Sequence, residues 1–143
     1  MSPIQTKSPL TLAGQIDLVD LLDSGDAPNT VISVNDPFKV TVDWSISGSV
    51  LPFLGGEWVV RALVESIGDG FEGQIGPTMV VQLTGAASYT TTIDVPAGTL
   101  PNPNVGQEDT VYKLVVLVSH RQFGVKTQIA GFGEGVLFEI QQP

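Results

Sequence analysis

The chain has 143 residues, of which 42% are hydrophobic and 15% charged, and its 15 acidic and 6 basic residues give a formal net charge of −9. This length suits one domain that buries its own core. The absence of cysteine excludes thiol nucleophiles, zinc–thiolate sites and iron–sulfur clusters. Because an acidic surface repels phosphates and anionic lipid headgroups, we expect no nucleic-acid partner and no membrane partner.

Residues 1–9 are expected to form the flexible N-terminus of a single domain that spans 1–143. They lack the apolar stretch of a signal peptide, which favours the cytoplasm. Export without such a signal, or loss of a leader, would leave the same sequence. No stretch of the sequence approaches the roughly 20 apolar residues that cross a membrane as a helix.

The first predicted strands are residues 10–22 and 30–34, where the alternation of apolar and polar residues is weak. Segment 16–22 could instead form a short helix with Asp17 and Asp20 pointing outward. The clearest alternation covers 38–47, and a period of two is typical of a strand with one buried and one solvated face. The residues expected to be buried there are Phe38, Val40, Val42, Trp44 and Ile46.

Further strands are predicted along the rest of the chain, separated by turns rich in glycine, proline, asparagine and aspartate. Segment 111–119 is apolar on both faces apart from Lys113, which suits a central strand. The other predicted strands are residues 57–66, 78–84, 89–95, 125–129 and 136–140.

Short strands at this spacing are typical of a sandwich or a barrel. We predict an all-β fold, and within that class a two-sheet antiparallel β-sandwich with Greek-key connections and about 7–9 strands.

Two predicted strands carry residues that resemble the fibronectin type III and immunoglobulin-like group. Trp44, within Val-Thr-Val-Asp-Trp-Ser, lies where that group often carries a core tryptophan, and Trp58 begins a Trp-x-Val-x-Ala pattern where its third strand would follow. Tyr112 begins a Tyr-x-Leu-x-Val pattern similar to the strand headed by the tyrosine corner. The resemblance implies a Greek-key sandwich used for binding or spacing, and it transfers no functional residue.

Catalytic machinery is not recognisable in the sequence. The one histidine, His120, is interpreted as a half-exposed residue at the start of a hairpin turn, and a hydroxyl nucleophile would need it as a base. Paired carboxylates could serve glycoside hydrolysis, but Glu65, Asp69 and Glu72, like Glu108 and Asp109, are interpreted as solvated turn residues. We therefore expect no enzyme and no cofactor.

Calcium is the one metal for which the sequence offers weak candidates. Asp23, Asp26 and Asn29 share a predicted loop, and loop oxygens are the ligands that calcium prefers. The alternation Asp-x-Asp-x-Asp-Gly is absent, and Asp-Ser-Gly-Asp is a good turn in its own right, so turn formation is favoured. Asp17 and Asp20, three residues apart, are expected on opposite faces of a strand.

The glycine-rich segment 131–135 superficially resembles a phosphate-binding loop. Such loops present backbone N–H groups at a helix N-terminus, whereas a predicted strand follows here. A bulge or tight hairpin with Phe132 turned inward is favoured instead.

Two loops are candidate contact surfaces. Segment 50–54 is apolar where a loop is usually polar, so it either caps the core or contacts a partner. Segment 96–109 is long for a loop in a compact domain. The candidate interaction residues are Val50, Leu51, Phe53, Leu54, Leu100, Asn102 and Asn104.

These observations favour a non-enzymatic structural or interaction module, a small acidic subunit that associates with other protein chains or with itself. The alternative is a carbohydrate- or calcium-binding module. In that case Trp58, Tyr89 or Phe71 would stack on a sugar.

Overall fold

The computed structural model describes residues 2–5, 12–48, 55–67, 71–101 and 110–141. Within these ranges the chain forms strands and no helix, which confirms the all-β prediction; accordingly, none of the described residues belongs to a helix that could span a membrane. The strands are β1 (Ser2–Gln5), β2 (Leu12–Leu22), β3 (Val31–Ser33), β4 (Phe38–Gly48), β5 (Glu57–Ile67), β6 (Gly73–Gln82), β7 (Ser88–Val95), β8 (Thr110–Gln122) and β9 (Val125–Gln141).

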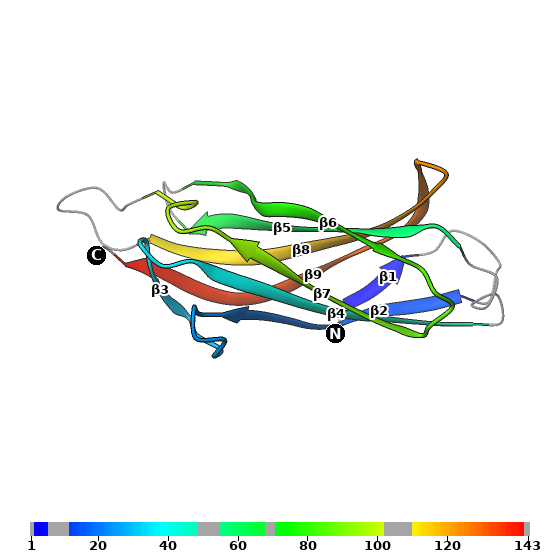
Figure 1. Cartoon of the computed structure of the whole chain (residues 1–143), viewed down its shortest axis with the longest axis horizontal. Coiled ribbons are helices and arrows are strands. Elements are labelled where there is room, and N and C mark those ends of the chain that lie inside the picture. The colour runs from blue at the N-terminus through cyan, green and yellow to red at the C-terminus, as the bar shows by residue number, and fades with distance from the viewer. Residues whose placement is uncertain (1, 6–11, 49–54, 68–70, 102–109, 142–143) are drawn as a thin grey trace.

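All the strands belong to one hydrogen-bonded sheet in the order β6-β5-β8-β9-β1-β2-β4-β7, with β3 added in parallel to β9. The other pairings are antiparallel. β9 and β1 share only two residue pairs, Ile4↔Gly131 and Gln5↔Ala130. Figure 1 shows long strands lying along the molecule, with β5, β6 and β8 on one side and β2 and β4 on the other. A division into two separate sheets is not confirmed.

The core lies between these two sides of the sheet. Trp44 of β4 meets Trp58 of β5 with ring centroids 6.1 Å apart, and it stacks on Tyr89 of β7 at 5.9 Å. At the other end, Phe138 of β9 lies 5.9 Å from Phe38 of β4. The Trp44–Trp58 and Phe38–Phe138 contacts join strands that are not neighbours in the sheet, so inward residues of β5 and β9 pack against those of β4. Trp44 and Tyr89 are paired on the neighbouring strands β4 and β7.

Glycines allow β9 to pass close to the opposite side. A Cβ built on Gly135 would lie 3.0 Å from the Val19 side chain and 2.9 Å from that of Leu114. A Cβ on Gly131 would lie 2.8 Å from the Pro3 carbonyl oxygen. A real Cβ atom rarely approaches so closely, so side chains at these positions would push β9 away from β1 and β2.

Several local predictions require correction. Segment 131–135 is not a turn, because β9 runs unbroken through it, and Phe132 points outward with 60% of its side chain exposed. A bulge does occur nearby, where the β8–β9 register shifts between Lys113 and Val115. Residues 2–5, expected to be flexible, form β1. The strand prediction for segment 16–22 is confirmed, and its helical alternative is not.

The two outer surfaces of the sheet differ in chemistry. The outward residues of β4 and β7 are polar, and they include Thr41, Asp43 and Thr90. The outward residues of the β5–β8 ladder include Leu63 opposite Val115. The surface over β4 and β7 is thus polar, whereas the surface over β5, β8 and β9 exposes apolar side chains such as Leu117 and Phe132 among charged ones.

Candidate docking surface

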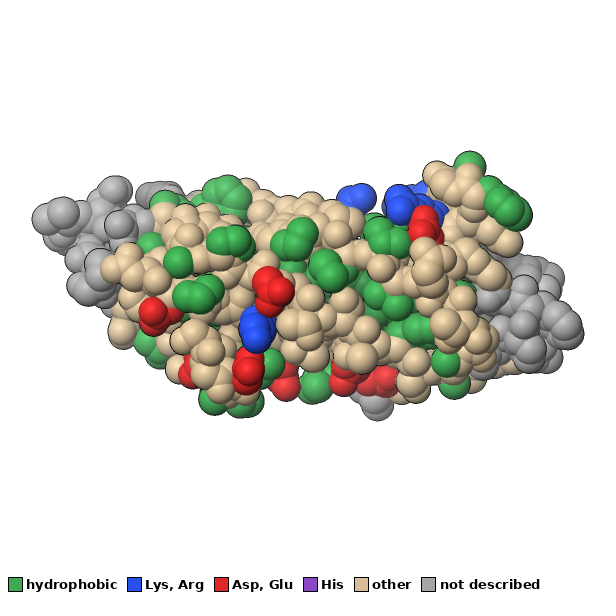
Figure 2. Space-filling model, in the orientation of Figure 1, with side chains coloured by type: hydrophobic (Ala, Val, Ile, Leu, Met, Phe, Trp, Pro, Cys, Tyr) green, Lys and Arg blue, Asp and Glu red, His purple; other side chains and the backbone are tan. Residues whose placement is uncertain are grey.

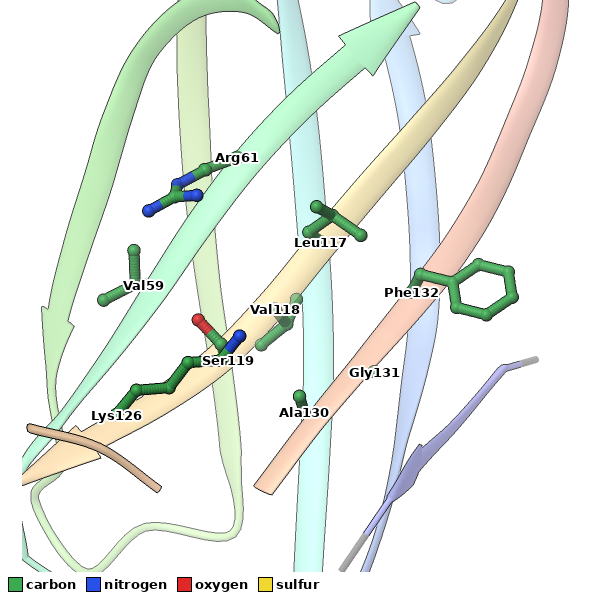
Figure 3. A pocket seen from close by; sticks show the side chains of 9 residues that line it. All are labelled: Val59, Arg61, Leu117, Val118, Ser119, Lys126, Ala130, Gly131 and Phe132. Carbon is green, nitrogen blue, oxygen red and sulfur yellow. The ribbon is translucent and has the colours of Figure 1, made fainter. Parts of the chain in front are cut away.

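An open groove of about 320 Å³ crosses the outer surface of β5, β8 and β9. Figure 3 shows Arg61 and Lys126 on one side of this groove and Phe132 on the other, with Leu117 and Ser119 between them. The complete lining is Val59, Arg61, Leu117, Val118, Ser119, Lys126, Ala130, Gly131 and Phe132.

Strand register brings these residues together. Leu117 of β8 lies directly opposite Arg61 of β5 on one side and Phe132 of β9 on the other. One step along, Ser119 lies between Val59 and Ala130. Directly paired residues on one face have Cβ atoms about 5 Å apart, so the exposed side chains of Leu117 and Phe132 lie side by side. Val59, which is only 5% exposed, lies diagonally across from Leu117 on β5.

Basic side chains border the groove, and not all of them are paired with a carboxylate among the described residues. Arg121 of β8 lies opposite Lys126 of β9, so two cations face each other across the ladder. The Arg121 guanidinium donates to Glu57, and this hydrogen bond lowers the pKa of the Glu57 carboxyl. Lys126 and Arg61 form no ion pair with any residue that the structure describes. We call Val59, Leu117, Phe132, Arg61 and Lys126 together the docking surface.

Other cations are paired within the chain. Lys113 Nζ lies 2.7 Å from Glu134 Oε1, and this carboxylate raises the pKa of Lys113. Lys39 on the opposite surface pairs with Asp26 at 2.8 Å, which raises the pKa of Lys39. Arg61 and Lys126 are therefore the two described cations whose charge is left for a partner.

An exposed apolar tip adjoins the docking surface. β8 and β9 are joined by Phe123 and Gly124, with φ angles of 53° and 75°. Two central residues with positive φ are typical of a type I′ hairpin turn, which asparagine and glycine favour and a bulky residue does not. Phe123 is 95% exposed. Figure 2 shows hydrophobic side chains at the end of the projecting hairpin and basic ones beside its base.

His120 is buried, so its interpretation as a half-exposed turn residue is wrong. Only 1% of its surface is exposed, and the ring packs 5.5 Å from that of Trp58. Its Nε2 lies 2.7 Å from the Gly55 carbonyl oxygen and its Nδ1 lies 2.8 Å from Thr127 Oγ1. Both ring nitrogens are thus engaged, and the residue joins β8, β9 and the segment before β5.

The weak calcium candidates are engaged in a turn. Asp23 Oδ1 accepts hydrogen bonds from the backbone N–H groups of Gly25 and Ala27, and Oδ2 accepts one from Asn29 Nδ2 at 3.3 Å. These bonds, led by the one from Ala27, lower the pKa of Asp23. Asp26 pairs with Lys39. Across the described ranges, no three His, Asp or Glu residues are placed to hold a metal ion.

Of the candidate interaction residues in the two loops, the structure describes Leu100 alone. Val50, Leu51, Phe53, Leu54, Asn102 and Asn104 lie outside the described residues. Leu100 is described and buried in the core, so its side chain is not available as a contact.

The aromatic residues considered for sugar stacking are also largely internal. Trp58 and Tyr89 are buried, whereas Phe71 is partly exposed. Tyr112, the third residue of β8, is fully buried next to Phe138, and burial raises the pKa of its hydroxyl, partly offset by the Phe71 backbone. The Tyr112 hydroxyl nevertheless forms no hydrogen bond with the Phe71 backbone or with any other residue described.

The docking surface was not predicted from the sequence, although one signal was present. Segment 111–119 is apolar on both faces apart from Lys113, a pattern that predicts a central strand. β8 is central, but its outward residue Leu117 stays exposed. Apolar residues at outward positions of an uncovered strand were therefore the available signal.

Comparison with known proteins shows similarity of fold. No protein-family model matches the sequence, and no curated protein does. Among solved structures, beta-glucosidase from Listeria innocua in complex with gluconolactone is similar over 96% of this chain, with a TM-score of 0.52 and 11% identity. The complex of beta-glucosidase from Listeria innocua with glucose gives 0.51 and 11%, also over 96%. The chain spans 17% of the length of each of these chains.

Proposed function

We propose that this chain is a non-enzymatic interaction module that binds another protein chain through the docking surface. The observation that carries the proposal is the exposed apolar pair Leu117 and Phe132 on β8 and β9, bordered by two cations with no described ion-pair partner. Exposed apolar surface of this kind is typical of protein contacts, and arginine and aromatic residues often dominate the binding energy there.

The outer face of the sheet, of which the docking surface is one part, is large enough for a specific contact. β5 has 11 residues, each advancing about 3.3 Å, and neighbouring strands lie about 4.8 Å apart. The outer surface of β6, β5, β8 and β9 then covers roughly 700 Å² by these spacings, against about 800 Å² per partner in a standard interface.

The immunoglobulin-like, Greek-key arrangement and the division into two sheets form part of the same proposal. The buried Trp44 and Tyr112, and the packing of β5 and β9 against β4, support it. Such folds often serve as scaffolds for binding.

A carbohydrate- or calcium-binding module has less support. The similar beta-glucosidase structures contain sugar ligands, but this chain corresponds to 17% of their length. Trp58 and Tyr89 present no ring face to solvent, and the Asp23 carboxylate already accepts turn hydrogen bonds.

A site-specific cross-linking experiment tests the proposal. A photo-reactive phenylalanine analogue would replace Phe132, and in a control chain it would replace Ile67, which is also 60% exposed but lies at the far end of β5. In the cells that produce the protein, position 132 should give adducts with a protein chain in several-fold greater yield than position 67. Equal yields, or no adduct from position 132, would reject the docking surface.

A further inference from the structure

An exposed leucine surrounded by acids lies on the opposite side of the molecule. Leu18 of β2 is 42% exposed and pairs in register with Asp43 of β4. Asp17 precedes it, and Asp20 follows two residues later, opposite Thr41. We call Asp17, Leu18, Asp20 and Asp43 the acidic patch.

A bulge gathers these acids on one surface. The β2–β4 register shifts between Ile16 and Leu18, so Asp17 is the extra residue of a β-bulge. It lines a shallow groove with Asp43, together with Thr90 of β7. The expectation that Asp17 and Asp20 face opposite ways is therefore wrong, because it assumed a regular strand.

The carboxylates of the acidic patch are not paired with any cation among the described residues. Gln15 Nε2 donates to Asp17 Oδ1 at 2.7 Å, and the Thr90 hydroxyl donates to Asp43. Both donors are neutral. Within the described parts of the chain, Asp17, Asp20 and Asp43 form no ion pair.

The acidic patch and the docking surface point in opposite directions. Trp44, next to Asp43, packs inward against Trp58, next to Val59. Since successive side chains of a strand point to opposite faces, Asp43 and Val59 point away from each other. The acidic patch thus lies on one side of the molecule, and the two cations Arg61 and Lys126 lie on the other.

We propose that the docking surface binds the acidic patch of a second copy of this chain. Leu18 of one copy enters the apolar groove beside Leu117 of the other, while Asp17 and Asp20 pair with Arg61 and Lys126. This inference rests on the proposed function, since it names the partner of the same surface.

The charges favour this arrangement over a symmetric dimer. Two docking surfaces placed together would bring the Arg61 and Lys126 charges of both copies to one apolar interface, and two acidic patches would bring carboxylates together. Like charges that meet at an interface weaken the complex. A contact between two different surfaces leaves one of each free on every dimer, so assembly continues past the dimer or closes into a ring.

Two charge-reversal variants test the inference in purified full-length protein. Wild-type protein should increase in mass beyond a dimer as its concentration rises in sedimentation velocity. Arg61→Glu/Lys126→Glu and Asp17→Lys/Asp20→Lys should each weaken association more than tenfold. These variants shift net charge in opposite directions, so a loss in both cannot arise from overall repulsion.

Restoring opposite charges on the two contacting surfaces is the control for these variants. The two variants mixed together should associate again, and so should one chain carrying all four substitutions, which has the wild-type net charge. Where a reversal lowers the melting temperature, Arg61→Gln/Lys126→Gln and Asp17→Asn/Asp20→Asn replace it. A monomeric wild type, a limit at the dimer, or unchanged association of Asp17→Lys/Asp20→Lys would overturn the inference. Cross-links from position 132 to another protein would then still support the proposed function.

Discussion

Single residues at the β8–β9 hairpin combine exposure with an unfavourable conformation. Phe123 has a φ of 53° and is almost fully exposed, so its ring gains little from packing in the isolated chain. A bulky residue in the left-handed region costs free energy that smaller residues avoid. Such strain at an exposed apolar tip fits a residue that is stabilised by a partner.

Replacing this residue should therefore stabilise the chain. Phe123→Asn gives Asn-Gly, the preferred type I′ sequence, and we expect the free energy of unfolding to rise by about 1 kcal/mol. Urea denaturation measures the change. Val125→Thr, at the same tip, is the control and should have little effect. A lower stability for Phe123→Asn would show that the ring contributes more by packing than it costs in strain.

Asp23 should give part of the acid sensitivity of the fold. Hydrogen bonds, first from Ala27, lower its pKa below the ordinary value of 3.8. A lowered folded pKa means that this stabilisation is complete above the ordinary value and is lost as the pH falls through the folded one. Asp23→Ala should slightly lower the melting temperature at neutral pH, and the difference from wild type should shrink below pH 3.8.

A matched variant separates the turn from the charge. Asp36→Ala removes the same charge from an exposed turn, where Asp36 donates its backbone N–H to the Ser33 carbonyl oxygen and its carboxylate accepts no hydrogen bond among the described residues. It should leave the melting temperature close to that of wild type across the same pH range. A difference for Asp23→Ala that stays constant down to pH 2 would argue against the carboxylate hydrogen bonds as the cause.

Among the elements, β9 connects most of the structure. It pairs with β8 over most of its length, and it also meets β1 at Gly131 and β3 near its end. Its glycines face inward positions where β2 and β1 approach, while Phe132 faces outward in the docking surface. One face of β9 therefore packs on the core, and the other face carries Phe132 of the docking surface.

A methyl group at Gly131 should disturb the contact between β9 and β1. Its Cβ would lie 2.8 Å from the Pro3 carbonyl oxygen and 3.1 Å from Ile4 Cα, and backbone atoms cannot turn away as a side chain can. Gly131→Ala should cost about 1–3 kcal/mol of unfolding free energy, as overpacking commonly does. Gly25→Ala, whose nearest neighbour is the Asp23 carboxylate at 3.4 Å, is the control. Equal effects of both substitutions in urea denaturation would contradict close contact between β1 and β9.

At the scale of the whole molecule, the sheet has two ends that meet without pairing. β6 and β7 are the edge strands and lie near each other, yet no backbone ladder joins them in the described residues. Pro77 within β6 lacks an N–H, and Gly76 has a φ of 71°, which interrupts a regular edge. Interrupted edges resist pairing with another sheet, so association through the sheet faces is favoured over association through its edges.

Hydrogen exchange should show that the edge strands open more readily than the central strands. β8, β5 and β4 have paired neighbours on both sides, whereas β6 and β7 have one each. We expect the slowest amides in β8 and β5 and faster exchange along β6 and β7, since edge strands open at lower free energy. Mass spectrometry of proteolytic fragments measures this directly. Equal protection of edge and central strands would indicate that β6 and β7 pair in solution.

The all-β class and most strand positions follow from the local pattern of residues. Alternation over 38–47 and 57–66 is a local property, because a strand presents every second residue to the core, and β4 and β5 begin at the predicted residues. The same reasoning failed for His120 and Phe132. Their burial depends on which distant residues lie next to them, and no local period contains that information.

The surfaces that a partner could use depend instead on how the strands pair and pack. Leu117 and Phe132 meet through the β8–β9 register, and Arg61 is left without a described ion-pair partner because β5 places it opposite Leu117. The β2 bulge likewise turns Asp17 and Asp20 to one side. Register, bulges and ion pairing arise from contacts between residues far apart in the chain, whereas alternation reflects only neighbours; the sequence therefore determined the strands, and the pairing of those strands determined the candidate site.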